Sequence, residues 1–441
     1  MRNQEFFYVN LFPIIKYKEM LHIPYLREHK NEIIEKLKIK NFEANEIITN
    51  LLIKDDQRKT IKKELDDLLS KSNKLSKEIG EMYQSGQTNK ANEIKTECTE
   101  IKENVKILQE KHTTLEKEIT EVLVQIPNVP HSSVPKGICD ADNKTIKEIG
   151  EKPDLHKNAK PHWVLSTDFD LIDFDLGNKI TGAGFPVYKG KGARLQRALI
   201  TYFLDKNIDA GYTEYLPPHV VNEASGFGTG QLPKFEEDLY KIPSDIDLYL
   251  IPTAEVPITN FFRNVIIQEF PIKCTAYTPC FRREAGSYGK DVRGLNRLHQ
   301  FDKVEIVQIQ HPEESYSTLD NMVKHVASIL DELELPYRII QLCGGDLSFT
   351  SALTFDLEVY SAGQDKWLEV SSVSNFENYQ ANRLKLRYKD ENGKSQFCHT
   401  LNGSALALPR IFAALIENNQ TEKGIKIPKV LQKYTGFDII D

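Results

Sequence analysis

The chain has 441 residues, a hydrophobic share of 40% and a formal net charge of −7, which together predict two or three domains with a sizeable core. No apolar run is long enough to cross a membrane, and the acidic balance excludes indiscriminate binding of nucleic acid, so RNA binding would need local basic patches. The six cysteines follow no metal-binding spacing, and we expect buried free thiols in a reducing cytoplasm.

The first nineteen residues form a short apolar segment that Pro13 interrupts. They have too little basic charge before the apolar part, and no small-residue cleavage site, for a signal peptide. Met20 offers a second start. Two interpretations stay open, a short N-terminal extension and a start assigned too early.

A long helical hairpin is predicted between about Ala44 and Val124, where the chain has no proline. Apolar residues recur there in heptads, at Ile61, Leu65, Leu68, Leu75, Ile79 and Met82, and then at Ile94, Cys98, Ile101, Val105, Leu108, Leu115, Ile119 and Val122. Polar Ser72 and His112 occupy the two missed positions, and residues 84–87 give a turn signal. We therefore expect two antiparallel helices within an N-terminal domain of residues 20–130.

The charges of this arm leave its role open. From Lys54 to Glu118 there are 14 basic and 14 acidic residues, so the arm is neutral. A basic stripe at Lys71, Lys74 and Lys77, with Lys90 near the turn, has the charge to follow a phosphate backbone. The same lysines also suit an ordinary solvated face of a spacer or a dimerisation rod.

Pro127 and Pro130 end the arm, and a loop-rich stretch follows to about Pro161. The remainder, residues 131–441, alternates short strands, glycines and isolated helices, which predicts an α+β domain built on a mainly antiparallel sheet flanked by helices. Within it, 192–207 has helical spacing, and 211–218 reads as a strand that ends in prolines.

Two segments place carboxylates beside other polar groups. Thr253 and Glu255 flank Ala254 in the segment 251–257, and in extended chain they share one face, where they can receive an ammonium group. Glu305 lies in a predicted strand, where a half-buried carboxylate is costly unless it is paired.

The segment 281–301 is the most informative stretch of the chain. It contains Arg282, Arg283 and Glu284, then a glycine-rich loop, and ends at Phe301. The flanking runs, 277–279 and 303–310, alternate as strands, which predicts a hairpin. A guanidinium can clamp a phosphate, a carboxylate can accept from an adenine amino group, and an aromatic ring can stack on the base.

Two further strands are predicted at 354–360 and 366–371, before the polar run Glu369-Val370-Ser371-Ser372. Strict alternation would put Glu369 on the same face as Ser371 and not Ser372, unless the strand ends or bulges there.

The segment 401–410 predicts a glycine turn followed by a helix that contains Arg410 and continues through the next ten residues. Pro409 lies inside this helix, so we expect a kink or a restart there.

Taken in order, these segments resemble the motifs of class II aminoacyl-tRNA synthetases, and the whole chain from about Met20 resembles the seryl-tRNA synthetase family of the bacterial type. The resemblance implies a serine site, an ATP site and two magnesium ligands. The implied serine site is Thr253, Ala254, Glu255, Arg282, Glu305 and Ser404. The implied ATP site is Arg282, Arg283, Glu284, Phe301, Glu369, Val370, Ser371, Ser372 and Arg410. Glu369 and Ser372 are the implied magnesium ligands, and Arg282 and Arg410 the catalytic residues. Which of Glu255 and Glu305 takes the serine hydroxyl stays open.

The resemblance further implies ATP-dependent charging of tRNA(Ser), and of tRNA(Sec) where it is present, by a cytoplasmic homodimer. Lys71, Lys74, Lys77 and Lys90 are the implied tRNA contacts, Mg²⁺ is the implied metal, and no zinc is expected. Two alternatives are a relative that charges a carrier protein and a non-catalytic scaffold on a degenerate synthetase. The long arm argues against the first, and the intact set of Arg282, Glu284, Glu369 and Arg410 against the second.

Overall fold

The computed structural model describes residues 23–284 and 293–441. The segment 1–19 and the glycine-rich centre of the predicted hairpin, 285–292, lie outside the described residues. The chain divides into two compact units, Leu21–Val129 and Pro130–Asp441. None of the described helices combines the length and the apolar character needed to span a bilayer.

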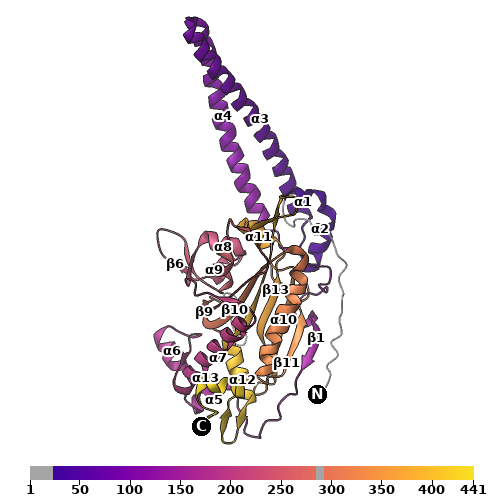
Figure 1. The fold of residues 1–441 in the computed structure, drawn as a ribbon, viewed down its shortest axis with the longest axis vertical. Coiled ribbons are helices and arrows are strands. Elements are labelled where there is room, and N and C mark those ends of the chain that lie inside the picture. Colours follow the sequence, from indigo (N-terminus) through magenta and orange to yellow (C-terminus); the bar gives the residue numbers. More distant parts are fainter. Residues whose placement is uncertain (1–22, 285–292) are drawn as a thin grey trace. The chain divides into compact units, whose positions relative to one another are not determined.

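The first unit is helical. It starts with α1 (Ile23–Glu28), α2 (Lys30–Leu37) and a 3-10 turn, Lys38–Lys40. The predicted hairpin follows as α3 (Asn45–Gln84) and α4 (Thr88–Leu123), which pack side by side (Figure 1). At ~1.5 Å per residue, α3 is about 60 Å long.

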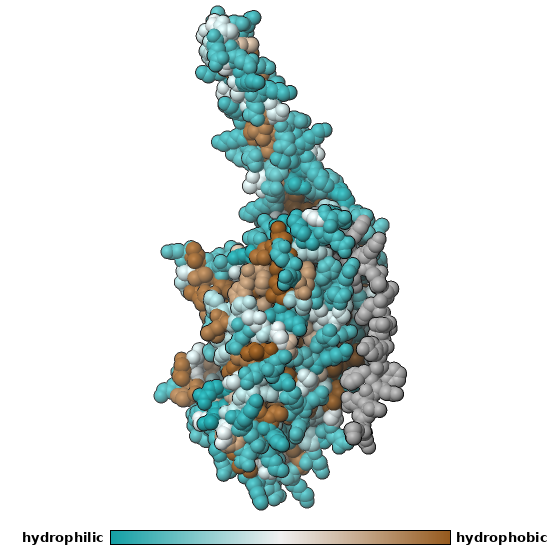
Figure 2. Space-filling model, in the orientation of Figure 1, coloured by the Kyte–Doolittle hydropathy of each residue, from teal (hydrophilic) through white to brown (hydrophobic). Residues whose placement is uncertain are grey.

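The heptad seam is confirmed. Leu65, Cys98, Ile101 and Ile119 are buried, and the other predicted seam residues are half-buried. The polar residues at the two missed positions, Ser72 and His112, are buried as well, because heptad spacing makes each of them face the opposite helix whether it is polar or apolar. The rest of the hairpin surface is largely hydrophilic in the view of Figure 2.

The second unit is built on an eight-stranded sheet in the order β1-β11-β12-β13-β16-β10-β9-β4. All neighbouring strands are antiparallel except β4 and β9, which confirms the α+β class. In sheet order the strands are Lys144–Ile149, Tyr337–Gln341, Leu353–Ser361, Lys366–Asn375, His399–Ala407, Gln300–Gln310, Ile272–Phe281 and Thr213–Glu214.

One face of this sheet is covered by helices α7 (Gly190–Asp209), α10 (Ser315–Glu332) and α12 (Leu408–Asn418), as Figure 1 shows. The amide of Asn207 in α7 donates to the Thr275 hydroxyl in β9 at 2.9 Å, and the amide of Asn375 in β13 donates to Ser315 in α10 at 3.1 Å. Because successive residues of a strand point to opposite faces, Glu305, Ser404 and Ser372 project from the other face.

Smaller elements complete this unit. The short helices are α5 (His162–Asp168), α6 (Phe174–Ile180), α8 (Glu223–Thr229), α9 (Glu255–Asn260), α11 (Tyr379–Leu384) and α13 (Lys429–Thr435), with 3-10 turns at Asp140–Asp142, Glu236–Asp238 and Pro312–Glu314. The small sheets are β2 (Ile172–Asp173) with β3 (Val187–Tyr188), β5 (Val220–Asn222) with β7 (Leu248–Leu250) and β6 (Lys241–Ile242), β8 (Ile266–Ile267) with β14 (Arg387–Lys389) and β15 (Ser395–Phe397), and β17 (Gln420–Thr421) with β18 (Gly424–Lys426) and β19 (Ile439–Ile440).

The stretch before Pro161 is loop-rich, as predicted, apart from a short 3-10 turn and the edge strand β1, which is almost wholly exposed and so has no apolar alternation to reveal it. Two expectations are wrong. The segment 399–407 is a strand, and α12 starts only at Leu408, so Pro409 lies in the first turn, where it needs no kink. Cys139 is exposed, whereas the other five cysteines are buried.

Candidate active site

The predicted hairpin is present as β9 and β10, paired from Phe281 opposite Gln300. Arg282 and Glu284 directly follow β9, and Phe301 lies in β10. All three line a cavity of about 480 Å³ on the face of the sheet that the three helices leave open. The Arg282 guanidinium lies 5.2 Å from the centre of the Phe301 ring, and its Nε donates to the Pro252 carbonyl at 3.3 Å.

Glu284 is held in an unusual backbone conformation, with φ at 53°, in the left-handed region that side chains other than glycine seldom adopt. Its carboxylate pairs with the Arg297 guanidinium at 2.7 Å. Such strain persists only where surrounding contacts enforce it, and it is common at ligand sites. The pair joins the two sides of the hairpin at the cavity wall.

A second region of the cavity is acidic and buried. The Glu305 carboxylate forms an ion pair with Lys303, two residues earlier on the same face of β10, and accepts from the Thr253 hydroxyl at 3.3 Å. Glu255 accepts from the Gln380 amide at 2.6 Å. Burial, reinforced by the nearby Glu305 carboxylate, raises the pKa of Glu255 to about 7. Ser404, opposite Glu305 in β16, completes this acidic region.

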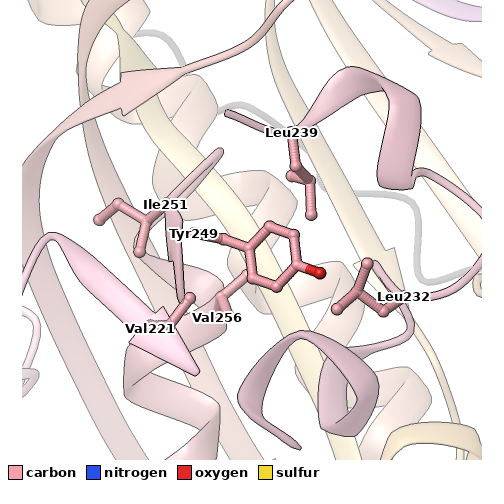
Figure 3. Packing of buried hydrophobic residues seen from close by; sticks show 6 residues of the cluster. All are labelled: Val221, Leu232, Leu239, Tyr249, Ile251 and Val256. Carbon is pink, nitrogen blue, oxygen red and sulfur yellow. The ribbon is translucent and has the colours of Figure 1, made fainter. Parts of the chain in front are cut away.

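Thr253 and Glu255 reach the cavity by a different route from the extended chain that we predicted. Glu255 is the first residue of α9, and its backbone N–H donates to the Thr253 hydroxyl at 3.2 Å. A small apolar core anchors this segment at Ile251 and Val256, and the Tyr249 ring lies among its members (Figure 3). Its six residues are Val221, Leu232, Leu239, Tyr249, Ile251 and Val256.

The alternation problem at Glu369 is resolved by a β-bulge. In the pairing of β12 with β13, Leu357 is opposite Ser371, but Glu358 is opposite Glu369, so Val370 is the extra residue. As a result Glu369, Val370 and Ser372 all line the cavity. Ser371 is buried and donates to the Ser404 carbonyl instead.

The oxygen atoms near Glu369 fit a hard divalent cation. The Ser372 hydroxyl donates to the Asp356 carboxylate at 2.6 Å, and burial together with the Glu369 charge holds the pKa of Asp356 well above its usual range. A bound cation would reduce the repulsion between the Glu369 and Asp356 carboxylates. Mg²⁺ needs few protein ligands, because it keeps water and phosphate oxygens in its coordination shell. No cluster of three His, Cys, Asp or Glu side chains suited to a metal occurs within residues 23–284 and 293–441.

Arg410, in the first turn of α12, lies along the wall of the cavity. Its Nη1 donates to the Glu369 carbonyl at 2.8 Å and lies 3.6 Å from the Glu369 carboxylate. Its Nε donates to the Asn296 carbonyl at 3.1 Å. The side chain thereby connects β13 with the returning side of the β9–β10 hairpin.

The structure brings most of the predicted site residues to one cavity. The predicted residues that line it are Thr253, Glu255, Arg282, Glu284, Phe301, Glu305, Glu369, Val370, Ser372, Ser404 and Arg410. Three others do not line it. Ala254 packs in a small apolar cluster with Ile258 and Cys274, Arg283 uses its backbone N–H to bond the Asp238 carbonyl, and Ser371 faces away.

The predicted tRNA-contacting lysines are all exposed and lie off the seam of the hairpin. Lys71 forms an ion pair with Glu97 of the partner helix at 2.7 Å. No ion pair is found for Lys74, Lys77 or Lys90 within the described part of the chain.

Lys303, Gln380 and Asp356 were not predicted from the sequence. Lys303 had a detectable signal, because it lies two residues before Glu305 in a predicted strand and so shares its face. Gln380 and Asp356 had none, since they are 125 and 16 residues away in the chain from the groups that they bond.

Comparison with known proteins gives a consistent result. Residues 238–419 match the tRNA synthetase class II core domain (G, H, P, S and T), and residues 20–130 match the seryl-tRNA synthetase N-terminal domain. The chain is 47% identical to the serine--tRNA ligase of Salinibacter ruber over 95% of this chain and 98% of that protein. It is 45% identical to the serine--tRNA ligase of Finegoldia magna over 96% of this chain and the whole of that protein.

Solved structures agree. The seryl-tRNA synthetase of Pyrococcus horikoshii complexed with ATP superimposes with a TM-score of 0.87 at 34% identity, and the match covers 96% of this chain and 99% of that one. The cytoplasmic serine-tRNA ligase of Naegleria fowleri in complex with AMP gives 0.83 at 28% identity, with the same coverage of each chain.

Proposed function

The chain belongs to the seryl-tRNA synthetase family and is a serine–tRNA ligase that binds ATP, and we propose that it makes seryl-adenylate in the cavity between Arg282, Glu305 and Arg410. The observation that carries this proposal is that one cavity has two unlike regions. One region has guanidinium groups beside an aromatic ring, and the other is a buried acidic pocket.

In the first step, a serine carboxylate oxygen attacks the α-phosphorus of ATP, and the bond from that phosphorus to the bridging oxygen breaks to release pyrophosphate. Such a displacement needs in-line positioning and neutralisation of charge more than a protein nucleophile. Arg282 holds the serine carboxylate and the α-phosphate together, and Arg410 binds the γ-phosphate. Glu284 accepts from the adenine amino group, and Phe301 stacks on the base.

In the acidic pocket, Glu305 is the acceptor for the serine ammonium group, together with Thr253. In the ligand-free protein the Glu305 carboxylate already pairs with a positive charge, the ammonium group of Lys303. Glu255, with a pKa of about 7, accepts from the neutral serine hydroxyl, with Ser404 beside it. A buried hydroxyl site of this kind rejects ligands that lack the hydroxyl, because its own polar groups then lose their partner.

Glu369 and Ser372 hold Mg²⁺ in this proposal, and the Asp356 carboxylate accepts a hydrogen bond from the hydroxyl of Ser372. When bound, Mg²⁺ neutralises charge on the departing pyrophosphate. Glu369 and Ser372 supply oxygen donors on the cavity wall, and Arg410 beside Glu369 supplies positive charge.

In the second step, the 3′ hydroxyl of tRNA(Ser), or of tRNA(Sec) where it is present, attacks the carbonyl carbon of the adenylate, and AMP leaves. Residues 20–130 form the tRNA-binding domain and residues 131–441 the catalytic domain. Lys71, Lys74, Lys77 and Lys90 contact the tRNA backbone. The exposed thiol of Cys139 suits a reducing cytoplasm, where the enzyme works.

The enzyme works as a homodimer. Leu216, two residues after β4, is 82% exposed, and the partly exposed Tyr215 and Phe261 rings lie 5.2 Å apart. Exposed apolar side chains just before the proline pair are suited to burial against a second copy of the chain. Analytical ultracentrifugation of Leu216→Glu should show a shift from dimer to monomer.

The test of the catalytic proposal is ATP–pyrophosphate exchange with each amino acid. Arg282→Ala should lower serine-dependent exchange by at least about 100-fold, the usual loss when one charge-stabilising group is removed, while the protein stays folded. Near-normal exchange in this variant would show that the ATP site lies elsewhere.

A further inference from the structure

His162 and Glu417 form a fully buried pair between α5 and α12, beside the cavity but outside its lining. The His162 Nδ1 lies 2.7 Å from the Glu417 Oε1, and both side chains are completely shielded from solvent. A buried carboxylate is costly unless its oxygen atoms are satisfied. The role of this pair is not part of the proposed chemistry, since neither residue lines the cavity.

The Glu417 carboxylate is fully satisfied. It accepts from the backbone N–H of His162 at 2.7 Å and of Gly363 at 3.1 Å, from the Ser361 hydroxyl, and from the Gln364 amide at 3.1 Å, in addition to the imidazole. Networks in which every member is bonded are rigid. Glu417 therefore fixes the position and the tautomer of His162, with the imidazole proton on Nδ1.

The other imidazole nitrogen points to the returning side of the β9–β10 hairpin. The backbone N–H of Leu295 donates to the His162 Nε2 at 2.8 Å, so this nitrogen must carry no proton. Gly294, with φ at 68°, permits the approach, since a Cβ there would lie 2.1 Å from the Nε2. Arg293 adds a second contact with α5, its guanidinium 4.8 Å from the Trp163 ring.

The two residues after Leu295 carry the cavity contacts. The Asn296 carbonyl accepts from Arg410, and its amide donates at 2.8 Å to Gln364, which belongs to the Glu417 network. Arg297 holds the strained Glu284. Three consecutive residues thus connect His162, Arg410 and Glu284, and a shift at Leu295 would move both groups that we assign to ATP.

We propose that His162 is a positioning residue, which fixes the Leu295–Arg297 segment so that Arg410 and Glu284 face ATP in the orientation that the reaction needs. The proposal rests on the assignment of the cavity to ATP. A displacement of about 1 Å from a reactive geometry can cost ~100-fold in rate, so loss of the Leu295 contact should reduce ATP use without affecting the serine pocket equally.

Two substitutions separate the two imidazole bonds. The amide of His162→Asn reaches the position of Nδ1 and keeps a donor for Glu417, but leaves the Leu295 N–H without an acceptor. The amide of His162→Gln reaches the position of Nε2 and restores that acceptor, but loses the donor to Glu417. We expect H162N to lower kcat/KM for ATP in pyrophosphate exchange by about 10-fold to 100-fold. The KM for serine at saturating ATP should stay within about twofold of its normal value. H162Q should regain most of the ATP activity while melting at a lower temperature.

Gly294→Ala approaches the same contact from the loop, so its effect on ATP use should match that of H162N. The double variant should be little worse than either one, because both changes remove a single contact. His325→Asn is the matched control, since it removes a half-buried imidazole bond, 2.7 Å to Asn207, on the helix-covered face. It should lower the melting temperature and leave KM for ATP unchanged.

The proposal fails if H162N and H162Q lower ATP and serine use in equal proportion, or if G294A and H162N act additively. If H162N does not fold, G294A alone tests the proposal, by the same comparison of kcat/KM for ATP with KM for serine. Failure here is distinct from failure of the catalytic assignment, because Arg282→Ala would still lower exchange by at least about 100-fold if the cavity is the ATP site.

Discussion

The α3–α4 hairpin and the Pro130–Asp441 unit contain buried polar side chains of two kinds. At the hairpin seam the buried polar groups make few bonds: the Nε2 of His112 has no hydrogen-bond partner among the described residues, and its Nδ1 lies 3.4 Å from the Glu116 carboxylate. In the sheet unit, by contrast, the buried Glu417 carboxylate belongs to a connected network and alone accepts from five donors. An apolar seam tolerates an isolated polar group at a local cost in stability. In our proposal, the Glu417 network transmits a change at His162 to Arg410 and Glu284.

This comparison predicts that changes in the two regions have different consequences. Substitutions in the sheet unit should alter adenylate formation, and substitutions in the hairpin should alter only the tRNA-dependent step. Four measurements test the difference, in order of decreasing effect.

Discrimination between serine and alanine should show the largest effect. Alanine lacks the hydroxyl that we assign to Glu255, so kcat/KM for alanine in pyrophosphate exchange should be up to ~10⁴–10⁵-fold below that for serine. Activation of alanine within about tenfold of serine would contradict our assignment of the acidic pocket.

Removal of the hairpin should separate the two half-reactions. Lys54 and Glu118 form an ion pair, so the two helices are close enough there for a short Gly/Ser turn to replace the residues between them. None of the cavity residues lies in the deleted segment. Exchange should therefore stay within about twofold of normal, while tRNA charging falls by at least ~100-fold, because the loss of several phosphate contacts costs orders of magnitude in affinity.

Both activities must be measured in the same truncated protein. If both persist, the hairpin is only a spacer. If exchange is lost while circular dichroism shows an intact fold, the hairpin supports the active site, and the division of labour that we propose is wrong.

Charge reversal on the hairpin should have a smaller effect of the same kind. Lys71→Glu, Lys74→Glu and Lys77→Glu together should raise KM for tRNA by about tenfold and weaken its dependence on salt, because fewer counterions are then released on binding. Lys102→Glu, Lys106→Glu and Lys111→Glu change the net charge equally on the other helix and serve as the control. Equal losses in the two triple variants would mean that total charge matters and the stripe does not.

The pH dependence of serine use should depend on Glu255. Its pKa is raised to about 7, so the carboxyl group is mostly ionised at pH 8 and mostly protonated at pH 6. Because the serine hydroxyl needs an acceptor, KM for serine should rise by about tenfold between pH 8 and pH 6, in proportion to the loss of carboxylate. Glu255→Gln cannot titrate, and its KM for serine should change little over this range. A wild-type KM that is flat with pH would contradict the role of Glu255.

The sequence by itself was sufficient for the repetitive and local features. The heptads predicted the α3–α4 seam, because packing on a partner helix depends only on spacing along the chain, and Ser72 and His112 at the two missed positions are buried for the same reason. The alternation around Arg282 and Phe301 predicted β9 and β10, since a strand shows its two faces in its own residues. Most of the residues that the motifs predicted for the site also line the cavity.

Only the tertiary structure decided the features that depend on distant partners. The bulge at Val370 arises from pairing with β12, and the strand at 399–407 forms because β10 and β13 lie on either side of it, which overrides its helical pattern. Gln380 reaches Glu255, and His162 reaches Glu417 and Leu295, across 125, 255 and 133 residues of chain. Such bonds leave no local pattern, because their geometry exists only after the sheet has brought the partners together.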